Sequence, residues 1–324
     1  MTWQLRHSVL LYIAALLQLT ASGQTFYKTF GSSNQNETAQ CVEQLTDGNF
    51  AIGGSKGDSA LVMKVDPFGN VLWTRCFKPV QGLNNLIYQL AATPDGYLIG
   101  TGSASPLGIL YNKTFLFKFD LAGNLIWQSH SSGLSPIWTH RIVPMSSTQY
   151  MAMTEVYDVN SPTWSDPFTS LINASTGLVD YNNPRLNFFT STPYIDDINA
   201  AALSPSSAVY GYGRTYVSGS SAGSMRPFIT KYDQTGQHLW TRYLMFPATQ
   251  SARIYGSDIT YADDSLITCY TGSISGTGTN FSVGMIRTDT SGNAAWIKDY
   301  KLQGYSAANS FTVLRMPYGF AITG

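Results

Sequence analysis

Short runs of apolar and β-branched residues alternate along most of this chain with clusters of Gly, Asp, Asn and Pro. Residues 60–65, for example, read Ala-Leu-Val-Met-Lys-Val, and Asp-Pro-Phe-Gly-Asn follows before apolar residues resume at Val71. Such runs are short for helices and typical of strands, and the clusters between them are typical of turns. The pattern therefore predicts an all-β protein.

One stretch recurs with the pattern D-x-x-G-(N/Q)-x-x-W, which we interpret as a tight turn between two strands. Glycine at the fourth place supplies a positive φ without steric cost, and the Asp can accept hydrogen bonds from the backbone of its own turn. We expect the Trp to fill the same gap in every unit, where it buries a large apolar area. The clear copies occupy residues 66–73, 120–127, 233–240 and 289–296.

The spacing of these copies indicates a regular repeat. Asp66 and Asp120 are 54 residues apart, and Asp233 and Asp289 are 56 apart. The 113 residues from Asp120 to Asp233 are close to two periods, and a degraded copy with Asn for Asp occupies residues 171–181. Self-similarity at this period is typical of propellers and solenoids.

Each unit reads as four strands, and radial repetition of four-stranded units describes a β-propeller. Residues 24–31 resemble the last strand of a unit that has lost its other strands. The third unit is divergent, with a loop expected through residues 162–167. The predicted blades are residues 37–77, 86–129, 139–186, 195–243 and 256–300, with a partial sixth blade at 305–324.

Ring closure leads to a further expectation. Each blade buries its faces only against its neighbours, so an open ring would leave two apolar faces in water. Five complete blades, a half blade and one orphan strand fall one strand short of six blades. We therefore expect the natural product to continue beyond Gly324, and the chain to be a truncated piece of it.

The N-terminal residues 1–23 have the features of a secretory signal peptide. An apolar stretch at residues 8–17 is followed by the small residues 21–23 before a cleavage site. A membrane anchor is the alternative, but the stretch is shorter than the roughly 20 residues that span a bilayer. We predict a mature propeller domain over residues 24–324, secreted or at the cell surface, with no membrane span.

The amino-acid composition limits the classes of partner that we expect. The chain has 19 basic and 19 acidic residues and no basic stripe, so we expect no nucleic-acid partner. Its 20 Tyr, 16 Phe and 7 Trp together with few charges suit an extracellular all-β protein. Cys41, Cys76 and Cys269 do not occupy equivalent places in the repeat. We favour buried free thiols, with a single Cys41–Cys76 disulfide as the alternative.

In three of the four copies a lysine stands two residues before the Asp, at Lys64, Lys118 and Lys231. Glycine pairs such as Gly53-Gly54 end earlier strands. In these features the repeat resembles secreted propellers that are cargo of the bacterial type IX secretion system. That resemblance implies a secreted repeat propeller and specifies no activity; the third unit and the lack of a C-terminal sorting domain depart from it. The repeat is also distantly similar to the tryptophan-docked repeats of quinoprotein dehydrogenases, without the adjacent cysteines that many of them place beside the quinone.

Candidate catalytic and metal-ligating residues are few. The histidines after the leader are scattered over different units without zinc-site spacing: His130, His140 and His238. The acid pairs at residues 196–197 and 263–264 could serve acid–base chemistry if one member were buried, but we expect solvated turn residues in both pairs. We therefore assign no catalytic, metal-ligating or cofactor-binding residue and no cofactor.

Three aromatic residues lie outside the repeat positions, at Trp138, Trp164 and Tyr216. Aromatic side chains on loops can anchor a partner or stack on sugars, and local loop packing is the alternative. We predict a monomeric, non-enzymatic binding scaffold for a protein or glycan. The alternative is a propeller hydrolase or lyase, or the non-catalytic part of a larger secreted enzyme. An enzyme should bring at least two acids or a metal together at the channel mouth, because propellers host both classes.

Overall fold

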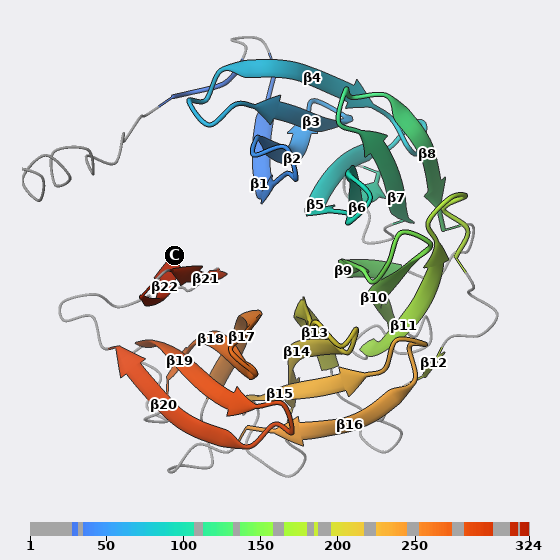
Figure 1. Cartoon of the computed structure of the whole chain (residues 1–324). Helices are drawn as coiled ribbons and strands as arrows, with labels where there is room; N and C mark the ends of the chain where they lie inside the picture. The colour runs from blue at the N-terminus through green and yellow to red at the C-terminus, as the bar shows by residue number, and fades with distance from the viewer. Residues whose placement is uncertain are drawn as a thin grey trace, which may run out of the picture.

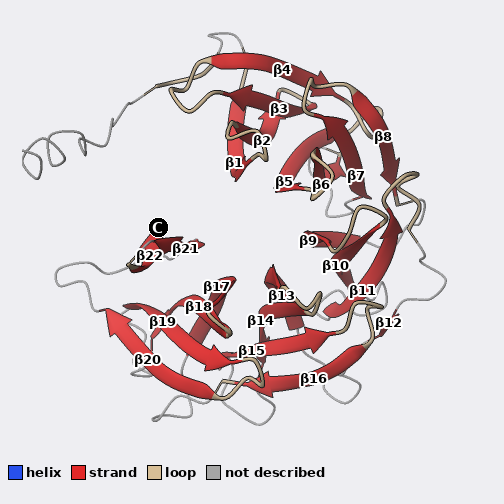
Figure 2. Ribbon diagram, in the orientation of Figure 1, coloured by secondary structure: helices blue, strands red, loops and turns tan. Residues whose placement is uncertain are grey.

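The computed structural model describes residues 28–31, 35–106, 113–131, 137–157, 165–179, 185–186, 196–216, 225–244, 253–273, 282–300, 312–316 and 318–323. Every regular element in these ranges is a β-strand, and the strands are arranged radially in six groups around a common axis (Figures 1 and 2). The predicted all-β propeller is therefore confirmed. None of the described segments is a helix of the length and apolar character needed to cross a membrane.

Five blades are antiparallel meanders of four strands, with the first strand nearest the axis and the last at the periphery (Figure 1). Blades 4 and 5 are joined into one sheet by a single parallel pair, Met225 with Arg253. The strands are β1 (Glu37–Gln44), β2 (Phe50–Lys56), β3 (Ser59–Val65) and β4 (Val71–Phe77) in blade 1; β5 (Asn84–Ala92), β6 (Tyr97–Ser105), β7 (Lys113–Asp120) and β8 (Leu125–His130) in blade 2; β9 (Ile137–Pro144), β10 (Gln149–Tyr157), β11 (Ser165–Asn173) and β12 (Arg185–Leu186) in blade 3; β13 (Asp196–Leu203), β14 (Val209–Tyr216), β15 (Met225–Tyr232) and β16 (His238–Tyr243) in blade 4; β17 (Arg253–Ala262), β18 (Ser265–Ser273), β19 (Ser282–Asp289) and β20 (Ala294–Tyr300) in blade 5; and β21 (Thr312–Met316) and β22 (Gly319–Thr323) in the partial blade 6.

The recurring turn has the geometry that its residues predict. Asp66 Oδ1 accepts hydrogen bonds from the N–H groups of Phe68 at 2.9 Å and Asn70 at 2.7 Å. The Asn70 side chain donates to Asp66 Oδ2 at 2.7 Å, and Gly69 has a φ of 74°. The N–H of Asn70 is the main cause of a lowered Asp66 pKa. The Asp is thus a turn cap, as expected.

The core lies between the blades. The described buried side chains form five clusters, and each cluster combines residues of two successive blades. In the cluster between blades 1 and 2, for example, Val62 of β3 packs with Phe117 and Phe119 of β7. The propeller is therefore held by apolar joints between adjacent sheets, which is why repetition rather than one central core stabilises it.

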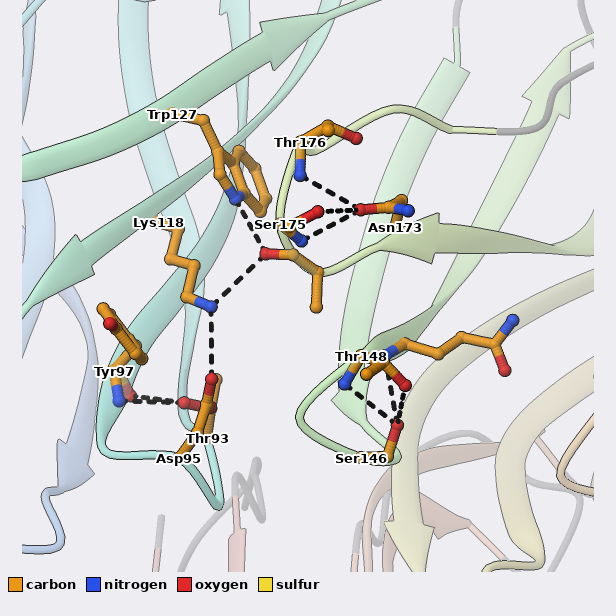
Figure 3. Close-up of polar contacts among 12 residues, drawn as sticks. Thr93, Asp95, Tyr97, Lys118, Trp127, Ser146, Thr148, Asn173, Ser175 and Thr176 are labelled. Atoms are coloured by element: carbon orange, nitrogen blue, oxygen red, sulfur yellow. Dashed lines mark hydrogen bonds and ion pairs between the residues drawn. The ribbon is translucent and has the colours of Figure 1, made fainter.

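A lysine and a tryptophan tie the first blades together across these joints. Lys118 Nζ and Trp127 Nε1 both donate to the carbonyl oxygen of Ala174 in the next blade, at 3.3 Å and 3.0 Å (Figure 3). Lys118 also pairs with Asp95 of its own blade at 3.4 Å. Between blades 1 and 2, the equivalent residues Lys64 and Trp73 both donate to one carbonyl in the next turn, and Lys64 pairs with the Asp of its own blade. The predicted role of the Trp is confirmed, and the lysine acts with it.

This contact explains a second constraint on the turn glycine. Gly177 has a φ of 70°, and a Cβ there would overlap the Trp127 ring of the previous blade. Gly123 and Gly292 lie in the same way against Trp73 and Trp240. The glycine is therefore needed both for its backbone conformation and for the close approach of the neighbouring tryptophan.

Three expectations from the sequence either differ from the structure or concern residues that the structure does not describe. The loop expected through residues 162–167 is partly strand, because β10 continues to Tyr157 and gives Ser165 and Pro167 ladder partners. The strand expected at residues 24–31 is described only from Lys28, and residues 28–31 are not in a strand. The predicted leader and the first part of the predicted sixth blade, residues 305–311, lie outside the described residues.

Candidate functional site on the propeller axis

The innermost strands of blades 1 to 5 share an irregularity that determines which side chains reach the axis. In each of them the pairing with the second strand shifts by one residue at a β-bulge. A bulge re-aims the side chains beside it, and bulges are frequent next to active sites. The residues that pair immediately after the bulges are Cys41, Gln89, Arg141, Ala200 and Asp258, and Thr312 of β21 has the same register.

These strands surround the axis of the ring (Figure 1). They line a cavity of about 750 Å³. Its lining comes from the innermost strands of all six groups, so the site exists only because the chain curves into a ring. The volume is in the range of small-molecule and oligosaccharide sites. Its charged and amide side chains are those of Gln40, Glu43, Gln89, Arg141 and Asp258.

Glu43 is the carboxyl group of blade 1 in this cavity. Its Oε1 accepts the N–H of Ala92, in the innermost strand of blade 2, at 3.0 Å. Burial raises the pKa of Glu43 above its ordinary value of 4.5, and the hydrogen bond from Ala92 opposes this only in part. A carboxyl group in such surroundings keeps its proton to higher pH than a solvated one, so Glu43 is suited to donate a proton.

Asp258 is the carboxyl group of blade 5. Its Oδ2 accepts the Thr312 hydroxyl at 2.5 Å and the N–H of Val313 at 3.0 Å. Gln89 holds the next blade in a similar way, because its Oε1 accepts the N–H of Ile142 at 2.6 Å and its Nε2 donates to the carbonyl oxygen of Ile142 at 3.3 Å. Gln89 and Asp258, at the position after the bulge, thus bridge neighbouring blades and are fixed in orientation by doing so.

Arg141 brings a positive charge to the same cavity. Burial lowers the pKa of its guanidinium, and the negative charge of Asp258 is the main influence that opposes this shift. The two side chains come from blades 3 and 5 and line one cavity. The axis therefore combines two carboxyl groups in different surroundings with one cation.

Cys41 also lines the cavity, but it is not suited to act as a nucleophile. Its thiol donates weakly to the carbonyl oxygen of Gly53 at 3.8 Å, and burial raises its pKa to about 12. A thiol with this pKa is almost wholly protonated at neutral pH. None of Cys41, Cys76 and Cys269 forms a disulfide, so the alternative of a Cys41–Cys76 bridge is wrong. Cys269 is buried as favoured, whereas Cys41 is partly buried and Cys76 is exposed.

The acid pairs singled out from the sequence have different outcomes. The expectation of solvated turn residues is wrong for Asp197, which is buried inside β13 and forms an ion pair with Arg214 at 2.7 Å. The register places Arg214 directly opposite Asp197, which compensates the buried charge. The second pair is in an exposed turn as expected, where Asp263 contacts Arg315 at 2.6 Å.

The structure does not describe the side chains of the three aromatic candidates. Trp164 lies outside the described residues, and the strands of Trp138 and Tyr216 are described without their side chains. Among described residues, no three His, Cys, Asp or Glu side chains come together as a metal site.

Sequence reasoning missed the axial residues Glu43, Arg141 and Asp258. One signal could have found two of them: when the first strands of the units are aligned on the bulge, one position holds a different residue in every blade, including Arg141 and Asp258. A variable polar position in an otherwise regular repeat indicates function rather than packing.

Comparison with known proteins supports the fold. No family model and no curated protein matches the chain. Among solved structures, it is similar to an α-L-arabinanase of Penicillium chrysogenum complexed with arabinobiose, with 12% identity, a TM-score of 0.51 and coverage of 82% of this chain and 93% of that one. A GH93 α-L-arabinofuranosidase of Fusarium graminearum with arabinobiose gives 12% identity, a TM-score of 0.54 and coverage of 88% and 87%. An apocarotenoid oxygenase of Synechocystis gives 13% identity, a TM-score of 0.52 and coverage of 90% of this chain and 66% of that one.

These similarities correct one prediction. The prediction of a non-enzymatic binding scaffold is contradicted by the similar solved structures named above, which include an arabinanase and an arabinofuranosidase. The criterion set from the sequence points the same way, since Glu43 and Asp258 line one axial cavity. Identities of this size show the fold alone, so the chemistry has to be argued from the site.

Proposed function

We propose that this protein is a glycoside hydrolase whose substrate binds in the axial cavity. The observation that carries the proposal is the presence of two carboxyl groups, Glu43 and Asp258, in one cavity of about 750 Å³. Most glycoside hydrolases use a pair of carboxyl groups on either side of the scissile bond, one as an acid and the other as a nucleophile or base. The predicted alternative of a propeller hydrolase thus becomes the main hypothesis.

The surroundings of the two groups assign their roles. Glu43, whose pKa is raised by burial, is the general acid that protonates the leaving-group oxygen. Asp258 is the second carboxylate, and its hydrogen bonds from Thr312 and Val313 hold it in one orientation. Fixed orientation matters because a misplacement of about 1 Å can reduce the rate by roughly 100-fold.

The first substrates to test are arabino-oligosaccharides. They are the compounds bound in the similar arabinanase and arabinofuranosidase structures. The purified protein should release reducing sugar from at least one member of a panel of arabinan, xylan, galactan and pectin oligosaccharides. Absence of hydrolysis across that panel would overturn the proposed function.

Two substitutions test the roles. Glu43→Gln keeps an acceptor for the N–H of Ala92 and removes the acidic proton, so kcat should fall by about 100- to 10,000-fold. Asp258→Asn should cause a loss of similar order. Glu37→Gln is the matched control, because Glu37 is on the same strand but pairs with Lys56 outside the cavity. A Glu43→Gln variant with native kcat would exclude Glu43 as the acid.

The pH profile gives an independent test. A general acid works in its protonated form, and burial raises the pKa of Glu43 above 4.5. Activity should therefore persist above pH 4.5 and fall as the pH rises through the raised pKa. This alkaline limb of kcat should be absent from the residual activity of Glu43→Gln.

We also propose that the protein is exported after cleavage of residues 1–23, as cargo of a type IX system or by a general secretory route. The apolar stretch and the small residues at its end support this proposal. Protein recovered from culture medium should begin at Gln24. Recovery of the uncleaved chain from cells alone would contradict it.

A further inference from the structure

Within the described part of the chain, Arg141 feels the charge of Asp258 but makes no direct contact with it that satisfies its guanidinium. Among the residues that the structure describes, no hydrogen bond or ion pair ends on it, and it is the only cation that lines the axial cavity. Burial lowers its pKa, which means that holding this charge on the axis costs free energy. A charged group kept in such a place without a direct contact of this kind indicates a ligand that supplies one.

Four other arginines contrast with Arg141. Arg214 and Arg315 form ion pairs, Arg287 donates to Ser265, and Arg75 donates to the carbonyl oxygen of Gly123. Each of these guanidinium groups is thus occupied by the protein itself. Arg141 differs from them although it lies on β9, the innermost strand of its blade.

The register of the bulge strengthens the contrast. Gln89 and Asp258 occupy the same position in their blades as Arg141, and both bind the innermost strand of the next blade. Blade 4, the next blade after Arg141, presents the small residues Ala200 and Ala201 at the equivalent height. The position that bridges two blades at Gln89 and Asp258 is here held by a side chain that lines the cavity.

We propose that the substrate is an acidic glycan and that Arg141 binds the carboxylate of a uronic acid unit in the axial cavity. The planar guanidinium fork matches a carboxylate with two parallel hydrogen bonds, and such charge-assisted pairs are short and strong. A singly charged ligand also suits a cavity that already contains Glu43 and Asp258, because a doubly charged phosphate would be repelled more strongly. This inference rests on the proposed glycosidase function and specifies its substrate class.

The test measures binding without turnover, in the Glu43→Gln variant. The probes are trigalacturonate, a glucuronic acid-substituted xylo-oligosaccharide, their neutral counterparts and a sulfated galacto-oligosaccharide, each titrated by calorimetry at fixed salt. One uronide should bind at least about 10-fold more tightly than its neutral counterpart. Binding of no uronide, equal affinity for the neutral counterpart, or tighter binding of the sulfated probe would overturn the proposal.

Substitutions of Arg141 complete the test. Arg141→Gln should reduce uronide affinity by about 10- to 100-fold and leave the affinity for the neutral counterpart unchanged. Arg141→Lys keeps the charge without the planar fork and should give an intermediate loss. Arg315→Gln, which removes a cation from β21 outside the cavity, is the matched control. Equal uronide affinity with and without Arg141→Gln in the Glu43→Gln protein, with matching thermal unfolding curves, would refute the role of Arg141.

Failure of the two proposals can be told apart. If Glu43→Gln abolishes hydrolysis while Arg141→Gln changes KM for no acidic substrate, the hydrolase stands and the acidic substrate falls. If native protein binds uronides through Arg141 but Glu43→Gln hydrolyses them at the native rate, the recognition stands and the catalytic assignment falls.

Discussion

The joint between blades 2 and 3 and the joint between blades 3 and 4 are built on different principles. In the first, Lys118 and Trp127 converge on one carbonyl oxygen and Asp95 pairs with the lysine (Figure 3). In the second, the positions of Lys118 and Asp95 hold Leu171 and Ser147. The space at the matching turns is a cavity of about 290 Å³, lined by Met145, Ser146, Gln149, Ser207, Gln234 and Thr235.

The difference teaches what the lysine and tryptophan contribute. The joint between blades 3 and 4 is an apolar cluster in which Met145, Met151 and Met153 pack with Phe228 and Tyr232. Methionine adapts to irregular gaps and specifies position poorly. A buried ion pair adds little net stability compared with apolar packing, but its hydrogen bonds fix geometry. We infer that the lysine–tryptophan contact sets the angle between two blades. The joint between blades 3 and 4, which we call the third joint, therefore allows more variation in this angle.

The largest effect is expected from Trp127→Ala. The indole is only 9% exposed and its N–H is hydrogen-bonded to Ala174, so removal should lower the free energy of unfolding by about 3–5 kcal/mol. Denaturant unfolding measures this. Trp296→Ala is the comparison, because that side chain is only partly buried and should cost less. Equal losses in the two variants would contradict a special role for the complete joint.

Introducing the lysine–aspartate pair into the third joint should give the next largest effect. Leu171→Lys alone should destabilise by about 2–4 kcal/mol, since its ammonium lacks a carboxylate. Adding Ser147→Asp should restore about 1–2 kcal/mol, measured as the coupling energy of a double-mutant cycle. A coupling energy below about 0.5 kcal/mol would show that the third joint cannot form the contact. The two joints would then differ in the positions of their backbones and not only in their side chains.

Lys118→Met should cost about 1–3 kcal/mol, because Asp95 then loses its cation while it is partly accessible to water. Lys231→Met is the matched control at the same register of blade 4, where the ammonium lies 5.3 Å from the centre of the Tyr210 ring. This second loss should be the smaller one. If Asp95 contributed nothing to the joint, the loss from Lys118→Met would not exceed the loss from Lys231→Met.

These joints also show why the fold could be predicted and the site could not. The turn motif carries its own geometry in Asp66 and Gly69, and the Trp at a fixed distance reports the packing of the next blade, so the repeat predicts the propeller. Glu43, Arg141 and Asp258 carry no local signal. They line one cavity because their blades, which share a bulge, are arranged around one axis.

The smallest effect concerns the turns themselves and is seen in acid. The N–H of Asn70 is the main cause of the lowered pKa of Asp66, so the turn stability that this carboxylate gives is present above its ordinary value of 3.8 and lost as the pH falls through the lower folded value. The same turn in blade 3 begins with Asn173, whose uncharged oxygen accepts the N–H of Ser175 at 3.0 Å.

Amide exchange compares these turns directly, because Gly69 N–H donates to the carbonyl oxygen of Asp66 and Gly177 N–H donates to that of Asn173. Between about pH 5 and pH 2.5, the protection factor at Gly69 should fall and that at Gly177 should stay constant. Asp66→Asn should make Gly69 behave like Gly177. A parallel fall at both glycines would place the acid sensitivity in the joints between blades rather than in the charged turn.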